Sequence, residues 1–461
     1  MNRPTSASHS PSLGESPPFP PARRTRRVVF AGVGAMAAGL LAACGPQAAG
    51  SGERKTTESA AITFMNRGGR EAFAVHDKVV AAFMEQTPTI QVNAEPVVEG
   101  SWSAKLTASL AGDTAADTVM CAFGSFLPFC KRGDILELGQ FLSKDRDVRP
   151  ADWFPLALES MKYKGRLFNM PYNGGTYALF YNKDLFDQER VQYPDDTWTW
   201  EKYVEAATQL TTDAAGRHAN EAGFDGTNVA RYGAHNIESA PSWWYWLWTY
   251  GSDLYTKNNT EVNLADPKAL DAIQWIADMH KRRIWPSDLF KDPQEMGFRQ
   301  GNVAMTTWGH WTVARVRTDP FKWDVAPMPK TPDGKRIALG WYSGNGIVST
   351  TKHPEAAWEF LKFFGGAPGQ RILGIEGLTL PAVRKVAESD EIMKTSPPDN
   401  QRAFLTEIDR ARIHIGWNIT EVNDWNEILN PALDQVWSGQ AKAKDILPAL
   451  VPRLNEVLAR N

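Results

Sequence analysis

The chain has 461 residues, a formal net charge of −3, 43% hydrophobic residues and 22% charged residues. These values are typical of a globular protein with two or three domains, and they exclude a chain that is disordered or collagen-like throughout. The slight excess of acidic residues argues against nucleic acid as a partner, because phosphate binding requires a basic surface. The 18 Trp residues are unusual and call for a reason beyond filling a core.

The first 43 residues have the composition of an export signal. Residues 1–20 are rich in Ser, Pro and Gly, four Arg residues follow between 23 and 27, and an uncharged stretch runs from Val28 to Ala43. A basic segment followed by a short apolar one is typical of a signal peptide, since a membrane-spanning helix needs about 20 apolar residues. Cleavage after Ala43 would remove five Arg and one Glu, which lowers the net charge from −3 to −7.

The signal ends in Leu41-Ala42-Ala43-Cys44-Gly45, which resembles a lipobox. In such a signal the peptidase cuts before a Cys that carries diacylglycerol. We therefore predict lipidation of Cys44, which would anchor the exported protein to the outside of the cell membrane. The adjacent arginines at 26 and 27 leave both the twin-arginine and the general secretory route open. Residues 44–60 are predicted to form a flexible tether.

From residue 61 onward, buried strands alternate with amphipathic helices. The predicted strands are 61–65, 89–98 and 118–123, and the predicted helices are 71–85, 102–111 and 126–131. This alternation is typical of a parallel sheet with helices on both faces. Cys121 and Cys130 lie in this part and are interpreted either as a disulfide or as two buried thiols.

Later elements are shorter or less regular. Strands are predicted at 166–169, 177–181, 336–338 and 346–349. Helices are predicted at 200–210, 267–283, 354–364 and, with a break at Gly439, 425–458. Thr199 and Asp266 precede two of these helices and are expected to cap them.

Several segments resemble those of the extracellular solute-binding proteins of ABC importers, the family that includes the maltose-binding protein. Residues 298–305 followed by 308–311 resemble its F-x-x-G-x-x-A-M…G-x-W signature. Further segments resemble the family in the same order, at 111–117, 171–186, 197–201 and 346–361. Ala116 departs from the pattern, which usually has Pro there. The resemblance covers residues 61–461.

The resemblance implies an α/β fold with two hinged lobes, the type II periplasmic-binding-protein fold, with a ligand cleft between the lobes. It places lobe one at 61–173 plus 327–379 and lobe two at 174–326 plus 380–461. It also implies a monomer that delivers its ligand to ABC permease subunits served by a separate ATPase. No cofactor and no metal ion are expected, and the sequence has no metal-binding motif.

Aromatic and polar side chains predict a sugar or oligosaccharide as the ligand. A Trp ring matches the apolar face of a sugar, while Asn, Arg and Ser bind its hydroxyl groups. The predicted ligand-binding residues are Asn66, Arg67, Phe123, Ser125, Asn173, Trp243, Trp244, Trp308, Trp311 and Trp341. Asn66, Arg67 and Ser125 follow predicted strands, where ligands of such sheets lie.

Other Trp residues are assigned to the core. Half of the four Trp between 243 and 248 are expected to pack inside, because one face of their helix must be buried. Trp275, Trp358 and Trp437 lie on predicted helices and are expected to be buried as well.

Two departures from the family indicate a ligand unlike maltose. The stretch corresponding to 121–125 carries acidic and aromatic contacts in the maltose-binding relatives but no acid here. Gly174 and Gly175 replace bulkier or acidic residues, which predicts a different or larger ligand at that point. The sequence leaves the identity, length and linkage of the sugar open.

Other functions remain open. A Trp-rich exported protein is also typical of carbohydrate-active enzymes, although no motif singles out the two carboxylates that glycoside hydrolysis needs. A surface adhesin could share the fold, since fold does not fix function. A polyol or a glycerol phosphate could replace the sugar, but the acidic mature chain, with Arg67 as its one obvious cleft cation, disfavours a phosphorylated ligand.

Overall fold

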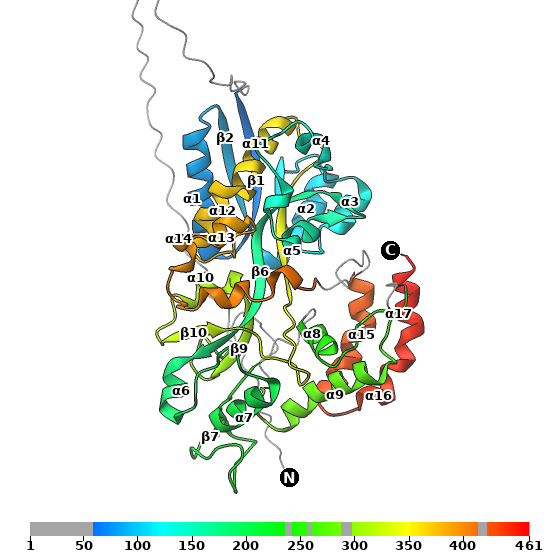
Figure 1. Ribbon diagram of the computed structural model, residues 1–461. Coiled ribbons are helices and arrows are strands. Elements are labelled where there is room, and N and C mark those ends of the chain that lie inside the picture. Colours follow the sequence, from blue (N-terminus) through cyan, green and yellow to red (C-terminus); the bar gives the residue numbers. More distant parts are fainter. Residues whose placement is uncertain (1–58, 236–241, 257–259, 287–296, 414–421, 461) are drawn as a thin grey trace, which may run out of the picture. The chain divides into compact units, whose positions relative to one another are not determined.

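The computed structural model describes residues 59–235, 242–256, 260–286, 297–413 and 422–460 (Figure 1). These residues belong to the larger of two compact units, 56–461. The predicted signal peptide and Cys44 lie outside the described residues. Among the helices that are described, none is both long and apolar enough to cross a membrane.

The first strands and helices form the predicted parallel arrangement. Strand β1 (Ala60–Gly68) pairs in parallel with both β2 (Ile90–Val98) and β3 (Thr118–Cys121). The helices between them are α1 (Arg70–Gln86) and α2 (Trp102–Ala111). The alternation of strands and helices in this part is therefore confirmed.

A single long strand replaces two predicted short ones. Strand β6 (Asn169–Asn182) includes 171–175, which lies between the predicted strands 166–169 and 177–181, and pairs there with β11 (Gly340–Ile347). Pro171 is accommodated because it lies opposite Gly344, where the register shifts at a β-bulge. The predicted strand at 336–338 is wrong, because pairing in β11 begins only at Gly340.

The sheet is organised around β6, which Figure 1 shows passing through the middle of the described chain. Its order is β10-β6-β11-β3-β1-β2, and β9 also pairs with β6. The first half of β6 pairs with β11, while its second half pairs with β9 (Met305–Gly309) and β10 (Trp323–Ala326). Strand β6 therefore joins the part of the sheet that contains β11, β3, β1 and β2 to the part that contains β9 and β10.

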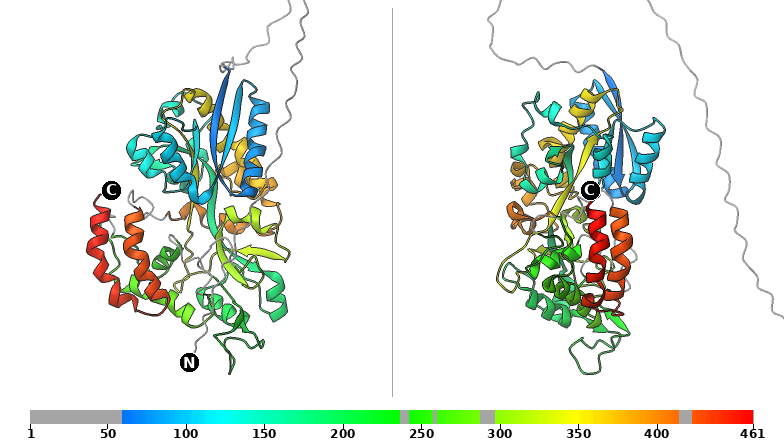
Figure 2. Two further views of the ribbon diagram at one scale, coloured as in Figure 1. Left: turned by 180° about the vertical axis from the view of Figure 1, so that it is seen from behind. Right: turned by 90° about the vertical axis from the view of Figure 1, so that its right-hand side faces the viewer.

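Helices follow the caps that the sequence provides. The Thr199 hydroxyl accepts the Lys202 N–H at 3.4 Å at the start of α7 (Trp200–Leu210), and Asp266 accepts the Lys268 N–H at 3.3 Å at the start of α9 (Pro267–Lys281). Both predicted caps are confirmed. In Figure 2 the orange α15 (Val422–Trp437) and the red α17 (Val451–Leu458) lie side by side in both views.

The remaining elements are mostly short. The helices are α3 (Leu127–Arg132), α4 (Gly139–Leu142), α5 (Pro155–Ser160), α6 (Lys183–Glu189), α8 (Ser242–Thr249), α10 (Val313–Val316), α11 (Pro354–Gly365), α12 (Ala367–Ile375), α13 (Arg384–Ala387), α14 (Asp390–Met393) and α16 (Ala443–Ile446). The strands are β4 (Lys162–Tyr163), β5 (Arg166–Leu167), β7 (Thr212–Asp213) and β8 (Val229–Arg231).

Two large hydrophobic cores are distinct. One joins β1 to α1 and α11, and the other joins α7, α8, α9 and α15. The second core contains all four Trp between 243 and 248, each at most 5% exposed, so the expectation that only half are buried is wrong. Trp358 is buried as expected, whereas Trp275 and Trp437 are only half-buried.

Candidate functional site

Four aromatic side chains from different parts of the chain meet in one cluster. Phe123 follows β3, Tyr177 lies on β6, Trp341 lies on β11, and Trp311 follows β9. We call these four residues the aromatic cluster. The ring centroids of Trp311 and Trp341 are 5.0 Å apart, and those of Tyr177 and Trp341 are 5.4 Å apart. The side chains of the cluster therefore connect the β3 and β11 part of the sheet with the β9 part.

Pairing of the strands explains why these side chains converge. Trp341 pairs with Gly175, and Tyr177 follows Gly175 by two residues, so Trp341 and Tyr177 extend from the same face of the sheet. Tyr177 in turn pairs with Gly309 at the end of β9, two residues before Trp311. Tyr177 was not among the predicted ligand-binding residues, because Gly175 lay outside the predicted strand 177–181 and its pairing with Trp341 joins distant segments.

Two glycines allow backbone and rings to come this close. A Cβ atom on Gly309 would lie 2.1 Å from the Trp311 ring, so this indole lies directly on the Gly309 backbone. A Cβ atom on Gly174 would lie 2.3 Å from the Trp341 carbonyl oxygen. Gly174 is thus required for close strand approach and does not open space for a larger ligand there. Of the two alternatives that the glycine suggested, a larger ligand is wrong at this point, and a different ligand stays a prediction.

The turn that carries Trp311 is fixed by its buried neighbour His310. The His310 Nε2 atom lies 3.2 Å from Gln401 Oε1, and the ring is fully buried. Burial, assisted by the positive charge of Arg317, lowers the pKa of His310 to about 3, so the ring is neutral at physiological pH. Trp311 itself is half-buried, which leaves part of its indole accessible.

The remaining members of the cluster differ in exposure. Trp341 is half-buried, whereas Phe123 is 4% exposed and stacks on Trp341 at a centroid distance of 6.0 Å. The Phe123 N–H donates to the Ser343 hydroxyl at 3.2 Å, which fixes the loop after β3. Phe123 thus packs against Trp341 and has little accessible surface for a ligand.

Polar residues predicted for the site are placed unequally. Arg67 and Ser125 are half-buried, and Arg67 donates to the Tyr172 hydroxyl at 3.3 Å. Asn66 is 1% exposed, and Asn173 donates its amide to the Leu378 carbonyl at 2.6 Å. Asn173 on β6 is half-buried as well, so Arg67, Ser125 and Asn173 keep some accessible polar surface, whereas Asn66 has almost none.

Three predicted Trp residues lie away from the cluster. Trp308 is 4% exposed and contacts Phe180 and Phe298, with ring centroids 5.7 and 5.5 Å away. Trp243 and Trp244 are 1% and 3% exposed in the core of α8. Burial of these indoles leaves almost no face for a ligand, so the structure does not bring them to the site.

Cys121 and Cys130 are buried free thiols. Burial raises the pKa of the Cys121 thiol to about 12 despite the nearby positive charge of Arg67. Burial likewise raises the pKa of Cys130. Both side chains therefore behave as small apolar groups beneath the loop that carries Phe123.

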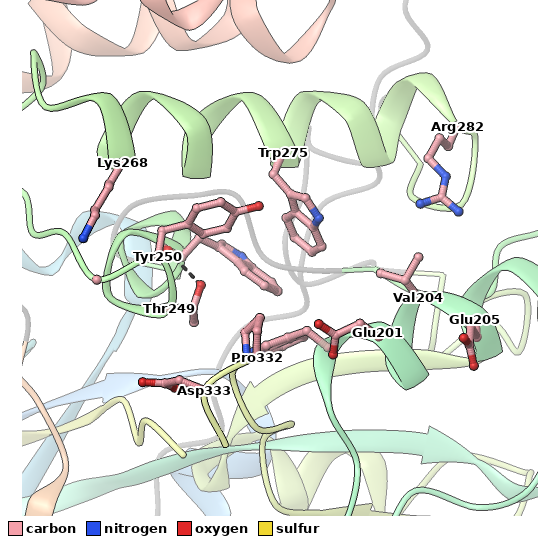
Figure 3. Close-up of a pocket in the computed structure, with 13 residues that line it drawn as sticks. Glu201, Val204, Glu205, Thr249, Tyr250, Lys268, Trp275, Arg282, Pro332 and Asp333 are labelled. Atoms are coloured by element: carbon pink, nitrogen blue, oxygen red, sulfur yellow. Dashed lines mark hydrogen bonds between the residues drawn. The ribbon is translucent and has the colours of Figure 1, made fainter. Parts of the chain in front are cut away.

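A separate hollow of about 730 Å³ lies between α7, α8 and α9 (Figure 3). Trp275 and Tyr250 project into it, with Glu201 and Glu205 on the α7 side and Lys268 and Arg282 on the α9 side. Charges of both signs ring the hollow, and none of the predicted ligand-binding residues lines it. It is therefore distinct from the aromatic cluster. Within the described residues no group of His, Cys, Asp or Glu is arranged to hold a metal ion.

Comparison with known proteins agrees with the motifs of the sequence. The profile of the family described as bacterial extracellular solute-binding protein matches residues 70–371. A galactooligosaccharide-binding protein of Bacillus subtilis is 23% identical over 88% of this chain and 91% of its own length. A sn-glycerol-3-phosphate-binding periplasmic protein of Rhizobium meliloti is 22% identical over 83% of this chain and 90% of its own length.

Solved structures share the fold. An ABC substrate-binding protein of Listeria monocytogenes, in complex with cycloalternan, superposes with a TM-score of 0.76 at 22% identity. The match covers 87% of this chain and all of the Listeria chain. The α/β fold is therefore the two-lobe fold of the periplasmic binding proteins, as the sequence predicts.

Proposed function

Because the chain belongs to the bacterial extracellular solute-binding protein family, we propose that it binds a sugar or oligosaccharide outside the cell and delivers it to an ABC permease. The family consists of binding proteins that act outside the cytoplasm. The permease would be powered by a separate ATPase subunit, so the chain itself needs only to bind and release its ligand.

The aromatic cluster carries this proposal. Trp311 and Trp341 are half-buried indoles. Trp311 follows the carboxyl end of β9, and Trp341 lies at the amino end of β11, which is antiparallel to β3 and so reaches the carboxyl end of β3, where ligands of α/β sheets bind. A rigid indole covers the apolar face of a sugar ring at low cost in conformational entropy. The galactooligosaccharide-binding relative and the cycloalternan complex of the Listeria protein are consistent with a neutral saccharide as the ligand.

Closure of the two lobes is the proposed mechanism. Near Gly174 and Gly175, β6 meets two other chain segments, since the Tyr177 N–H donates to Leu339 and the Leu380 N–H donates to Gly174. Lobe boundaries at 173/174 and 379/380 would place the hinge among these segments, and the boundary at 326/327 would follow Ala326, which pairs with Leu179 of β6. A ligand that contacts both lobes stabilises the closed state by its higher affinity for that state.

Anchoring to the membrane is a separate part of the proposal. Lipidation of Cys44 and a flexible tether at 44–60 would hold the binding unit close to its permease. Metabolic labelling with a radioactive fatty acid tests this directly. Label in the parent protein and none in Cys44→Ala is expected, whereas equal label in both proteins would contradict the assignment of Cys44.

A thermal-shift screen of the purified protein tests the ligand class. Mono- and oligosaccharides, polyols and sugar phosphates are added in turn, and a ligand that binds only the folded state raises the melting temperature by mass action. We expect a shift with one class of neutral saccharide and no new product on chromatography. A product would indicate a carbohydrate-active enzyme. A shift with glycerol phosphate alone would indicate a ligand like that of the sn-glycerol-3-phosphate-binding relative. No shift with any of the compounds would favour a non-sugar solute or an adhesin.

A further inference from the structure

Arg412 is linked through its backbone to the residue that precedes Trp341 of the aromatic cluster, since its carbonyl accepts the Gly340 N–H at 3.3 Å. The Arg412 guanidinium lies over the Trp248 ring, 4.1 Å from its centroid, and forms an ion pair with Asp253. The Arg412 side chain is 42% exposed and that of Asp253 is 31% exposed. Neither residue belongs to the predicted ligand-binding set, and both are accessible to a small molecule.

Backbone pairing places Arg412 on the same face as the cluster. The Arg412 N–H donates to the Ala338 carbonyl at 2.8 Å, and Leu339 and Arg412 form a parallel bridge. Residues that pair across a sheet extend from the same face, as do residues two apart along a strand. Leu339 precedes Trp341 by two residues, so the side chains of Arg412 and Trp341 extend from one face of neighbouring segments.

The pair is held in a fixed orientation. Asp253 Oδ1 accepts the Trp248 indole N–H at 3.0 Å and the Leu254 N–H at 2.8 Å. Its Oδ2 atom accepts from Arg412. The Trp248 indole lies against the guanidinium, whose five N–H groups form a rigid fork. Within the described residues, only one guanidinium nitrogen has a hydrogen-bond partner, Asp253. No described residue therefore occupies the other N–H groups of Arg412, which could donate to a ligand.

We infer that Arg412 and Asp253 form a hydroxyl-binding subsite next to the aromatic cluster, one that selects a neutral polyhydroxylated ligand over a phosphorylated one. This inference rests on the proposed function. A hydroxyl group both donates and accepts hydrogen bonds, so adjacent hydroxyls match a guanidinium edge and a carboxylate at once. A phosphate would gain from Arg412 but face the negative charge of Asp253, and the pair carries no net charge to attract it.

Binding of neutral and phosphorylated probes to the purified protein tests the subsite. Maltotriose, a galactooligosaccharide and sn-glycerol 3-phosphate are titrated calorimetrically into the parent protein, Arg412→Met and Asp253→Asn. Loss of a charged hydrogen bond corresponds to about a ten-fold loss of affinity or more, and we expect this for the neutral saccharide in Arg412→Met. Asp253→Asn should weaken saccharide binding and strengthen glycerol phosphate binding.

The chain offers a matched control. Arg384 lies over the ring of the core residue Phe154 at 4.4 Å and pairs with Asp409, so it has similar chemistry at the surface of the core that joins β1, α1 and α11. Arg384→Met should lower thermal stability about as much as Arg412→Met and change saccharide affinity less than about two-fold. If Arg412→Met does not fold, Arg412→Lys keeps the positive charge but removes the planar fork, and the same loss of saccharide affinity is expected.

The outcomes separate the subsite from the proposed function. If the parent protein binds a saccharide and the Arg412 variants bind it equally well, the subsite is refuted and the proposed function stands. If the parent protein binds no saccharide, either here or in the thermal-shift screen, both are refuted. Tighter binding of sn-glycerol 3-phosphate than of any saccharide by the parent protein would refute the charge argument.

Discussion

Trp308 and Trp311 stand three residues apart, yet they lie in different environments. Trp308 extends from β9 into the core, where Phe180 and Phe298 surround it. Trp311 lies in the turn after β9, half-buried against Trp341 and Tyr177. The same side chain therefore contributes to stability at one position and presents an accessible ring at the other, and the end of the strand separates the two roles.

Trp308→Ala should have the largest effect, and it should fall on stability. Removing a buried indole leaves a cavity and costs about 3 to 5 kcal/mol in the free energy of unfolding. Urea unfolding measures this loss, while saccharide affinity of the folded protein should stay within about two-fold of the parent value. A variant that loses affinity but keeps its stability would return Trp308 to the ligand site, where the sequence analysis placed it.

Trp311→Ala should show the opposite pattern. Loss of a stacking face lowers saccharide affinity by roughly ten-fold or more, whereas a half-buried ring contributes less to folding than Trp308 does. Titration by intrinsic fluorescence or calorimetry measures the affinity. Trp275→Ala is the matched control, because Trp275 is also half-buried but lines the hollow between α7 and α9. Equal affinity in Trp311→Ala and the parent protein would refute the aromatic cluster as the site.

The difference between these two environments explains what the sequence could predict. The alternation of β1, α1, β2, α2 and β3 was predictable, because apolar spacing and length are local properties. The caps at Thr199 and Asp266 were predictable for the same reason. Exposure of a Trp depends on strand pairing between distant segments, so nothing near 308 or 311 distinguishes the two residues.

Other differences between prediction and structure have the same origin. The sequence around Pro171 and Gly174 looks like a turn, but pairing with β11 extends it into one strand. The missing side chain at Gly174 suggested additional space for a ligand, but the Trp341 carbonyl oxygen lies where that side chain would be. Arg412 carried no local signal, because its contacts with Trp248 and Asp253 join residues more than 150 positions apart.

Lower pH should weaken the core and leave the cluster unchanged. Burial, together with the positive charge of Arg67, lowers the pKa of His76 to about 3, so the folded state excludes the proton that the unfolded chain accepts below about pH 6.5. Stability therefore falls as the pH decreases from 6.5, and the share of His76 is about 1 kcal/mol at pH 5.5. Urea unfolding at pH 7.5 and 5.5 should show a smaller fall in His76→Gln than in the parent protein.

Saccharide affinity, unlike stability, should not depend on pH in this range. The aromatic cluster contains Phe, Tyr and Trp only, and the pKa of the adjacent His310 lies near 3, so none of these groups changes charge between pH 7.5 and 5.5. Saccharide affinity of the folded protein should be the same at both values. A loss of affinity at pH 5.5 in a fully folded sample would show that a titrating group contacts the ligand.

Phe123→Leu should have the smallest effect on saccharide affinity. It tests whether Phe123 acts only by holding Trp341 in place. Phe123 is 4% exposed and stacks on Trp341 with an interplanar angle of 18°. Leucine preserves most of the apolar volume but removes the ring contact, which is worth about 0.5 to 1.5 kcal/mol. If all of this energy supported ligand binding, saccharide affinity would fall by about two- to ten-fold, and we expect no larger loss. Phe123→Tyr keeps the stacked ring and should bind nearly as well as the parent protein. If Phe123→Leu instead loses as much affinity as Trp311→Ala, and Phe123→Tyr does not restore it, Phe123 contacts the ligand directly. Phe123 would then belong with the accessible aromatic residues that contact the ligand, and not with the buried residues that support them.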